Sequence, residues 1–436
     1  MQLINVLKRG LRRMEYTKMT EAELKAELKK VRRQYERIKG LGLNLDMSRG
    51  KPSPQQLSLS EPMLSMKLGS DDYFNEQGMD CRNYGGLDGV IECKRIFSEI
   101  LEVNTDNIIL GGVSSLNLMY DFISQCMTHG IGDEPWLSQG DVKFICAVPG
   151  YDRHFAIAEY FGIEMVLVDM TETGPDMDAV EKLVKDEKVK GMFCVPKYSN
   201  PTGVTYSDET VRRFAALKPA AKDFRVIWDN AYCVHDFNDH PDRLLNIFEV
   251  AKEYGSEDLF VEFASTSKIT FSGGGISCIA ASDSNIKMIK YRFSRQTIGN
   301  DKLNQLRHYK FLRDKEGVMA LMRKHAELIV PKFNKVLEVL DRELGDLGVA
   351  HWTRPNGGYF ISFNATSCSA KRVGELCKEA GVTLTNVGAT FPYGKDPNDR
   401  NIRIAPTLPP VHEIEKAAEV LCLCVKMATL EHLLEK

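Results

Sequence analysis

The distribution of apolar and polar positions predicts alternating strands and helices. Seven short apolar runs are typical of buried strands: Asn107 to Leu110, Lys143 to Val148, Glu164 to Asp169, Val189 to Val195, Arg225 to Asp229, Leu259 to Ser265 and Ile276 to Ala281. Segments with helical periodicity separate most of them. Such alternation is typical of an α/β protein whose mainly parallel sheet is covered by helices on both faces. The sequence therefore predicts a three-layer sandwich around a seven-stranded sheet.

The remaining third of the chain predicts a smaller α+β domain. Residues 292–340 read as a long helical connector, and the last helix, Val411 to Leu434, is expected to be apolar on one face. Strands are expected at Trp352 to Phe363, Val382 to Asn386 and Ile402 to Ala405. We therefore expect an N-terminal helix and substrate-closing segment at residues 1–70, a large domain at 71–310 and a small domain at 311–436. The N-terminal segment is expected to pack with the small domain.

The start of the first helix carries a local signal. Thr20 and Glu23 have the spacing of a capping box, and Gly40 ends the helical pattern. Ahead of it, Met1 to Arg13 is basic and is interpreted as a solvated leader.

Composition narrows the class of protein. The 436 residues are 43% hydrophobic and 27% charged, and the net charge of −3 argues against a nucleic-acid partner. No run approaches the roughly 20 apolar residues of a membrane span, and no secretory signal opens the chain. The eleven cysteines lack metal-type spacing, so we expect no metal site and a reducing, cytoplasmic location.

Four polar side chains stand at the ends of predicted strands. They are Asn200, Asp229, Tyr232 and Lys268. The carboxyl ends of parallel strands meet at one edge of a sheet, so these groups are expected to lie together. A lysine amine forms a Schiff base with the aldehyde of pyridoxal phosphate, and a carboxylate keeps the pyridine nitrogen protonated. The amide and the phenol can both donate hydrogen bonds to the ring oxygen, so the set predicts a pyridoxal 5'-phosphate site.

A phosphate cradle is expected nearby. Gly111 to Ser115 follows a predicted strand and opens a predicted helix, where free N–H groups favour an anion. Ser114 and Ser115 are thus candidate phosphate ligands, and Ser265 and Ser267 could add hydroxyl donors.

At these motifs the chain resembles the fold-type I enzymes of the aspartate aminotransferase superfamily. More narrowly, residues 47–54 (MSRGKPSP), 83–89 (NYGGLDG) and 265–271 (STSKITF) resemble the bacterial type Ic branch. The resemblance implies that Tyr151 stacks on the cofactor ring and that Arg403 binds the substrate α-carboxylate. It further implies that Gly50 belongs to a loop closing over the substrate, and that Tyr84 reaches the phosphate of a neighbouring subunit in a homodimer.

The resemblance also implies an activity. It is ping-pong transamination from aspartate to 2-oxoglutarate, with Lys268, Asp229 and Tyr232 as catalytic residues. One departure is Ile276, which stands eight residues after the lysine where many relatives carry a phosphate-binding arginine. The cation for a substrate side-chain carboxylate stays open among several candidates: Arg49, Lys51, Arg292, Arg295 and Arg307.

Three alternatives remain open at this point. The chain could be an aminotransferase for aromatic amino acids, alanine or aminoadipate, or it could be a β-lyase of the same fold. It could also be a regulator that uses such a domain as a ligand sensor. Fewer than fifty residues precede the first core motif, which argues against a DNA-binding domain there.

Overall fold

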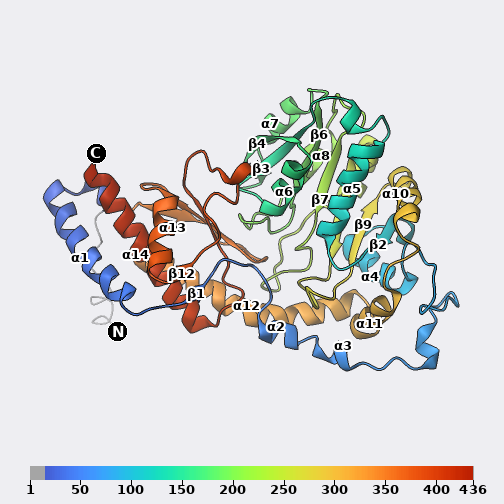
Figure 1. The fold of residues 1–436 in the computed structure, drawn as a ribbon, viewed down its shortest axis with the longest axis horizontal. Coiled ribbons are helices and arrows are strands. Elements are labelled where there is room, and N and C mark those ends of the chain that lie inside the picture. Colours follow the sequence, from blue (N-terminus) through green and yellow to red (C-terminus); the bar gives the residue numbers. More distant parts are fainter. Residues whose placement is uncertain (1–14, 436) are drawn as a thin grey trace.

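A sheet of eight strands forms the core of the larger half of the molecule (Figure 1). The computed structural model describes residues 15–435, so the predicted leader, Met1 to Arg13, lies outside the described residues. The strands are β2 (Ile108–Leu110), β3 (Lys143–Val148), β4 (Glu164–Thr171), β5 (Gly174–Pro175), β6 (Val189–Cys194), β7 (Arg225–Asp229), β8 (Phe260–Ser265) and β9 (Ser277–Ala281). Their order across the sheet is β2-β9-β8-β7-β6-β3-β4-β5.

The sheet is mainly parallel, as the alternating pattern predicts. Strands β4, β3, β6, β7 and β8 run in one direction, and β9 pairs antiparallel with both β8 and β2. All seven predicted strands are present. The eighth, β5, is a two-residue edge strand paired with β4, which is too short for a hydrophobic pattern to reveal.

Helices cover both faces of this sheet, which confirms the three-layer architecture. One face carries α4 (Ile91–Leu101), α7 (Met177–Leu183), α8 (Asp208–Ala215) and α9 (Ile247–Tyr254). The other carries α5 (Ser115–His129), α6 (Asp152–Tyr160) and α10 (Asp283–Gln296). Alternate residues of β7 and β8 enter the two cores, because successive side chains of a strand point to opposite faces.

The smaller half contains a three-stranded antiparallel sheet, ordered β10-β11-β13, from Ala350–Trp352, Ile361–Ala365 and Asn401–Ile404. The prediction of one strand from Trp352 to Phe363 is wrong. Pro355 and the pair Gly357 and Gly358 break it into β10 and β11, and Gly358 has a φ of +80°, which a glycine adopts readily. The segment predicted at Val382 begins β12 (Val382–Thr383), which pairs with β1 (Leu45–Asp46) instead.

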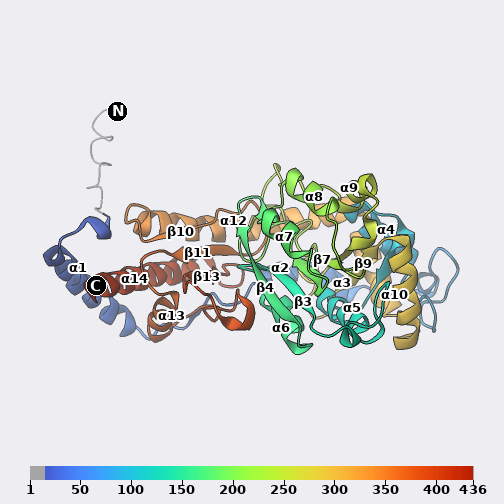
Figure 2. The same ribbon diagram turned by 90° about the horizontal axis from the view of Figure 1, so that it is seen from above.

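The first and last helices lie side by side in both views (Figures 1 and 2). In α1 (Glu21–Lys39), Leu24, Leu28, Val31 and Tyr35 form one buried stripe, and the predicted capping box is present. The last helix, α14 (Val411–Glu435), differs from the prediction of a single apolar face. Its side chains from Val420 to Leu430 are all buried, because α1, α12 and α13 (Ala370–Glu379) surround it.

One long helix packs against both halves of the molecule. The first turns of α12 (Lys315–Leu344) pack Val318 and Leu321 beside α4, whereas Phe333 and Val336 enter the core around α14. Within the expected N-terminal segment, α1 and β1 pack on the smaller half, while α2 (Pro54–Ser58) contacts α12 and α3 (Glu61–Ser65) contacts α11 (Lys302–Leu312). The three-domain division itself stays a prediction. Among the described residues, no helix is long and apolar enough to cross a membrane.

Candidate active site

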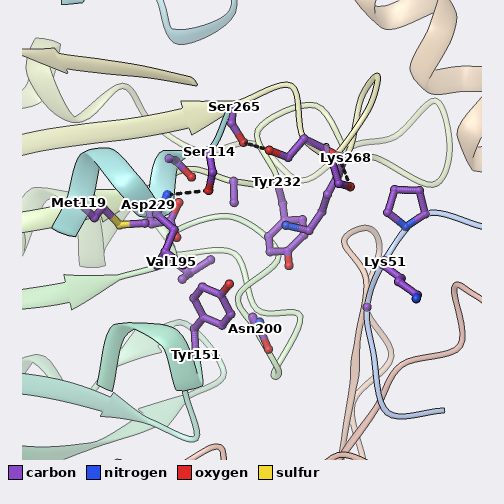
Figure 3. A pocket seen from close by; sticks show the side chains of 17 residues that line it. Lys51, Ser114, Met119, Tyr151, Val195, Asn200, Asp229, Tyr232, Ser265 and Lys268 are labelled. Carbon is purple, nitrogen blue, oxygen red and sulfur yellow. Dashed lines mark hydrogen bonds between the residues drawn. The ribbon is translucent and has the colours of Figure 1, made fainter. Parts of the chain in front are cut away.

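A cavity of about 250 Å³ lies at the carboxyl ends of the parallel strands. It collects the predicted site residues Gly50, Ser114, Ser115, Tyr151, Asn200, Asp229, Tyr232, Ser265, Ser267 and Lys268 (Figure 3). Two predicted residues, Tyr84 and Arg403, do not line it. The four side chains predicted at strand ends, Asn200, Asp229, Tyr232 and Lys268, therefore lie around one cavity although they are up to 68 positions apart in the chain.

Lys268 stands in a turn that its neighbours fix. The Thr266 N–H donates to the Ile276 carbonyl at 2.8 Å, and the Ile276 N–H donates to Thr266 Oγ1 at 2.9 Å. The Lys268 amine lies 4.9 Å from the centre of the Tyr232 ring and 5.9 Å from that of Tyr359. Removal of water from this amine lowers its pKa, and the negative charge of Asp229 opposes that shift. A lysine in such a place deprotonates more easily than one in water.

Asp229 has one paired and one unpaired oxygen. His154 Nε2 lies 3.0 Å from Asp229 Oδ2, and the imidazole stacks on Phe193 at 4.7 Å between ring centres. Asp229 Oδ1 is buried and makes no hydrogen bond within the described residues. A buried carboxylate oxygen without a partner is costly. It is well suited to a protonated ring nitrogen of a bound ligand, so the site fits pyridoxal phosphate.

Two phenols face this carboxylate. Burial is the main cause that raises the pKa of Tyr232 well above its ordinary value, with the nearby Tyr151 and Asp229 as further causes. Burial, Asp229 and Asp152 likewise raise the pKa of Tyr151. Both hydroxyls therefore stay protonated at neutral pH and can act as hydrogen-bond donors.

Ser114, Ser265 and Ser267 lie on two loops that meet at the N-terminus of α5. Ser114 caps α5 by accepting from the Leu116 N–H at 3.1 Å, and Ser267 Oγ donates to the Val113 carbonyl at 3.2 Å. Ser265 Oγ donates to Ser267 Oγ at 3.1 Å. The N-terminus of α5 and these hydroxyls thus lie together, an arrangement with donors suited to an anion.

Ile276 takes no part in that anion site. Its side chain is 2% exposed and belongs to the hydrophobic core under β8. Among the described residues that line the cavity, Lys51 and Lys268 carry the positive charges. Arg292 lines a separate cavity and donates to the His129 and Gly130 carbonyls, and Arg295 lies over the Tyr291 ring. Of the candidate cations, Lys51 alone lines this cavity.

Arg403 approaches the site from β13 in the smaller half. Its Nη1 donates to Asp152 Oδ1 at 2.8 Å and to Asn200 Oδ1 at 3.2 Å. The guanidinium lies 5.0 Å from the centre of the Phe360 ring. Arg403 is thus one hydrogen bond away from the cavity wall at Asn200, although it does not line the cavity.

Sequence reasoning missed several neighbours of the site, namely Asp152, His154, Tyr359 and Phe360. His154 lies one helical turn after Tyr151, so its position on α6 was a usable signal once Tyr151 had been chosen. No local pattern marks Tyr359 or Phe360, because both reach the site only through the folding of the smaller half.

Comparison with known proteins decides the family. The family model for "Aspartate amino-transferase" matches residues 19–436. The chain belongs to the aspartate aminotransferase family. It is an aminotransferase, so the β-lyase and ligand-sensor alternatives are not needed.

The similarity of this aminotransferase to its relatives extends over nearly the whole length of the chain. It is 46% identical to an aspartate aminotransferase from Corynebacterium glutamicum over 92% of this chain and 93% of that protein. The crystal structure of an aspartate transaminase from that organism matches with a TM-score of 0.92, covering 94% of this chain and 97% of the other. An α-aminoadipate aminotransferase from Thermus thermophilus, in complex with N-(5'-phosphopyridoxyl)-L-leucine, shares the fold with a TM-score of 0.72 at 19% identity, covering 89% and 93%.

Proposed function

We propose that this aminotransferase uses pyridoxal 5'-phosphate to transfer the amino group of aspartate to 2-oxoglutarate. One observation carries the cofactor assignment: the unpaired, buried Oδ1 of Asp229 lies in the wall of the same cavity as the Lys268 amine. The Corynebacterium relative, an aspartate aminotransferase at 46% identity, supports aspartate as the donor.

The residues that would hold the cofactor have separate tasks. Asp229 would bind the ring nitrogen, and Tyr232 and Asn200 would donate to the ring oxygen. Tyr151 would stack on the ring. Ser114, Ser115, Ser265 and Ser267 would bind the phosphate at the N-terminus of α5. When bound, the cofactor supplies an aldehyde for amines and a ring that withdraws electrons.

The protein's own chemistry then centres on Lys268 and Arg403. With its pKa lowered by burial, the Lys268 amine can take a proton from the substrate α-carbon and return one later in the cycle. The guanidinium of Arg403 would bind the α-carboxylate through paired N–H donors. We assign the side-chain carboxylate to Lys51, because it lines the cavity whereas Arg292 and Arg295 do not.

We also propose a homodimer with shared sites. Tyr84 is 82% exposed and does not line the cavity of its own chain. This exposure supports the expectation that Tyr84 completes the phosphate site of a second subunit.

The first test is the visible absorption spectrum of the purified protein, before and after L-aspartate is added without any 2-oxo acid. We expect the band of the aldehyde form of the cofactor to convert to that of its amine form. L-Alanine, L-tyrosine and L-2-aminoadipate serve as competing donors. If one of these converts the cofactor faster than L-aspartate does, that amino acid is the preferred donor and the aspartate assignment is wrong. Absence of a cofactor band after reconstitution would refute the cofactor assignment.

A further inference from the structure

The arginine that we assign to the substrate α-carboxylate already binds a carboxylate of the protein itself. Arg403 Nη1 lies 2.8 Å from Asp152 Oδ1. Arg403 belongs to β13 in the smaller half, and Asp152 opens α6 in the larger half, directly after Tyr151. The ion pair therefore crosses between the two halves at the edge of the cavity.

The burial of the two partners differs. The Arg403 side chain is 8% exposed, whereas that of Asp152 is 33% exposed. A buried guanidinium without a counter-charge is destabilising, so the empty enzyme gains from a carboxylate at this place. Asp152 is also exposed enough to exchange its arginine partner for water without large cost.

Protein oxygens already occupy Nη1 of Arg403. Nη1 serves both Asp152 and Asn200, and Nε lies 3.5 Å from Thr385 Oγ1. One face of the guanidinium lies over Phe360. A substrate carboxylate binds an arginine best through two parallel N–H donors. Such binding by way of Nη1 requires that Asp152 release it.

We propose that Asp152 is a positioning residue that competes with substrate carboxylates for Arg403. It neutralises the arginine between turnovers and gives way when the α-carboxylate enters. Since the amino acid and the 2-oxo acid share that group, Asp152 weakens the binding of both to the same degree. This inference rests on the role of Arg403 in the proposed function.

The test uses Asp152→Asn in the full-length, cofactor-reconstituted chain, with Glu159→Gln as the matched control. Glu159 is an exposed acid on the same helix, and its backbone carbonyl accepts a hydrogen bond from the Gly162 N–H. We expect the KM values for L-aspartate and 2-oxoglutarate to fall together by roughly three- to tenfold, as loss of a partly exposed ion pair implies. The kcat should change less than twofold, and Glu159→Gln should leave both constants unchanged.

A readout without turnover separates competition from a structural role. Maleate, an unreactive dicarboxylate, is titrated by calorimetry, and thermal unfolding is followed with and without it. Without maleate, Asp152→Asn should unfold at a lower temperature than the wild type. It should bind maleate more tightly, and maleate should raise its unfolding temperature by more than it raises that of the wild type. Asp152→Glu, which keeps the charge, should behave like the wild type. Should Asp152→Asn not fold, Asp152→Ser, which also suits a helix start, takes its place.

A rise or no change in maleate dissociation constant for the Asp152 variant would overturn the inference. The Arg403→Ala variant distinguishes a failure of this inference from a failure of the proposed function. If Arg403→Ala leaves maleate binding unchanged, the carboxylate role of Arg403 is wrong. If it weakens binding while Asp152→Asn has no effect, only the competition is wrong. In the double variant, the effect of Asp152→Asn should disappear.

Discussion

Two polar residues, Asn230 and Glu262, form a hydrogen bond directly behind the strand ends that carry the site. Asn230 follows Asp229 directly and points to the other face of the sheet. There its Nδ2 donates to Glu262 Oε1 at 2.8 Å. Glu262 lies on β8, six positions before Lys268. Burial raises the pKa of Glu262 to about 7, and the hydrogen bond from Asn230 opposes the shift. A titratable carboxyl thus stands behind the strand ends that hold Asp229 and Lys268.

The raised pKa gives a pH dependence of defined sign. The folded protein binds the Glu262 proton more tightly than the unfolded chain does, so this group favours folding below pH 4.5, its ordinary pKa, and the contribution is lost as the pH rises to about 7. We expect the unfolding free energy of wild type, relative to Glu262→Gln, to fall by roughly 3 kcal/mol over that window. Urea denaturation at several pH values measures this difference. A difference that is flat with pH would exclude the titration of Glu262, and Glu159→Gln provides the control.

At the scale of elements, the segment around Gly50 connects the two halves. Gln56 Nε2 donates to the Tyr359 hydroxyl at 3.1 Å and lies 3.0 Å from His325 Nδ1. His325 Nε2 in turn lies 3.0 Å from the carbonyl of Ile269, the residue after Lys268. Burial lowers the pKa of His325 to about 4, so this bridge is neutral in the physiological range. The loop that carries Gly50 and Lys51 is therefore tied to the lysine turn.

Gly50 itself leaves space for Phe360. A Cβ atom at this position would overlap the Phe360 ring, on whose face Arg403 lies. We expect Gly50→Ala to displace the ring and the arginine with it, and to raise KM for both substrates by roughly tenfold or more. Steady-state kinetics measure the change. Gly40→Ala, at the end of α1 where a Cβ meets only ordinary contacts, should leave KM unchanged. Equal KM values for the two variants would show that the contact is not needed.

At this scale, some elements of the fold leave a signal in the sequence and others do not. The apolar runs ending in Asp229 and Ser265 predicted their strands and the place of the site, because a buried parallel strand leaves a local hydrophobic signal. The pairing of β1 with β12 joins Leu45 to Val382, and two-residue strands carry no such signal. Asp152 was overlooked because an acid at a helix start has an ordinary local explanation. Its partner Arg403 comes from the other half of the molecule.

At the scale of the whole molecule, the proposed homodimer with shared sites can be tested by mixing two variants. If Tyr84 serves a neighbouring site, two defective chains can complement each other. Lys268→Ala removes the reactive amine of its own site, and Tyr84→Ala removes the donor to its neighbour's site. In a mixed dimer, one site then has both defects and the other has neither.

We expect a mixture of the Lys268→Ala and Tyr84→Ala chains, refolded together, to regain activity. At equal amounts half of the dimers are mixed, and each has one intact site, so about a quarter of wild-type activity should return above that of the separately refolded proteins. The assay is aspartate-dependent transamination. Activity no greater than the sum of the separate samples would argue that each chain completes its own site.

The contact between α1 and α14 has a consequence for biosynthesis. The apolar stripe of Leu24, Leu28, Val31 and Tyr35 is translated nearly 400 residues before its partners on α14. At about 5–20 residues per second, the stripe remains without its final cover for roughly 20–80 s. The larger half can complete its sheet during that interval. For this aminotransferase, α1 is therefore translated long before the helix that covers its apolar stripe, and it is among the last elements to be buried.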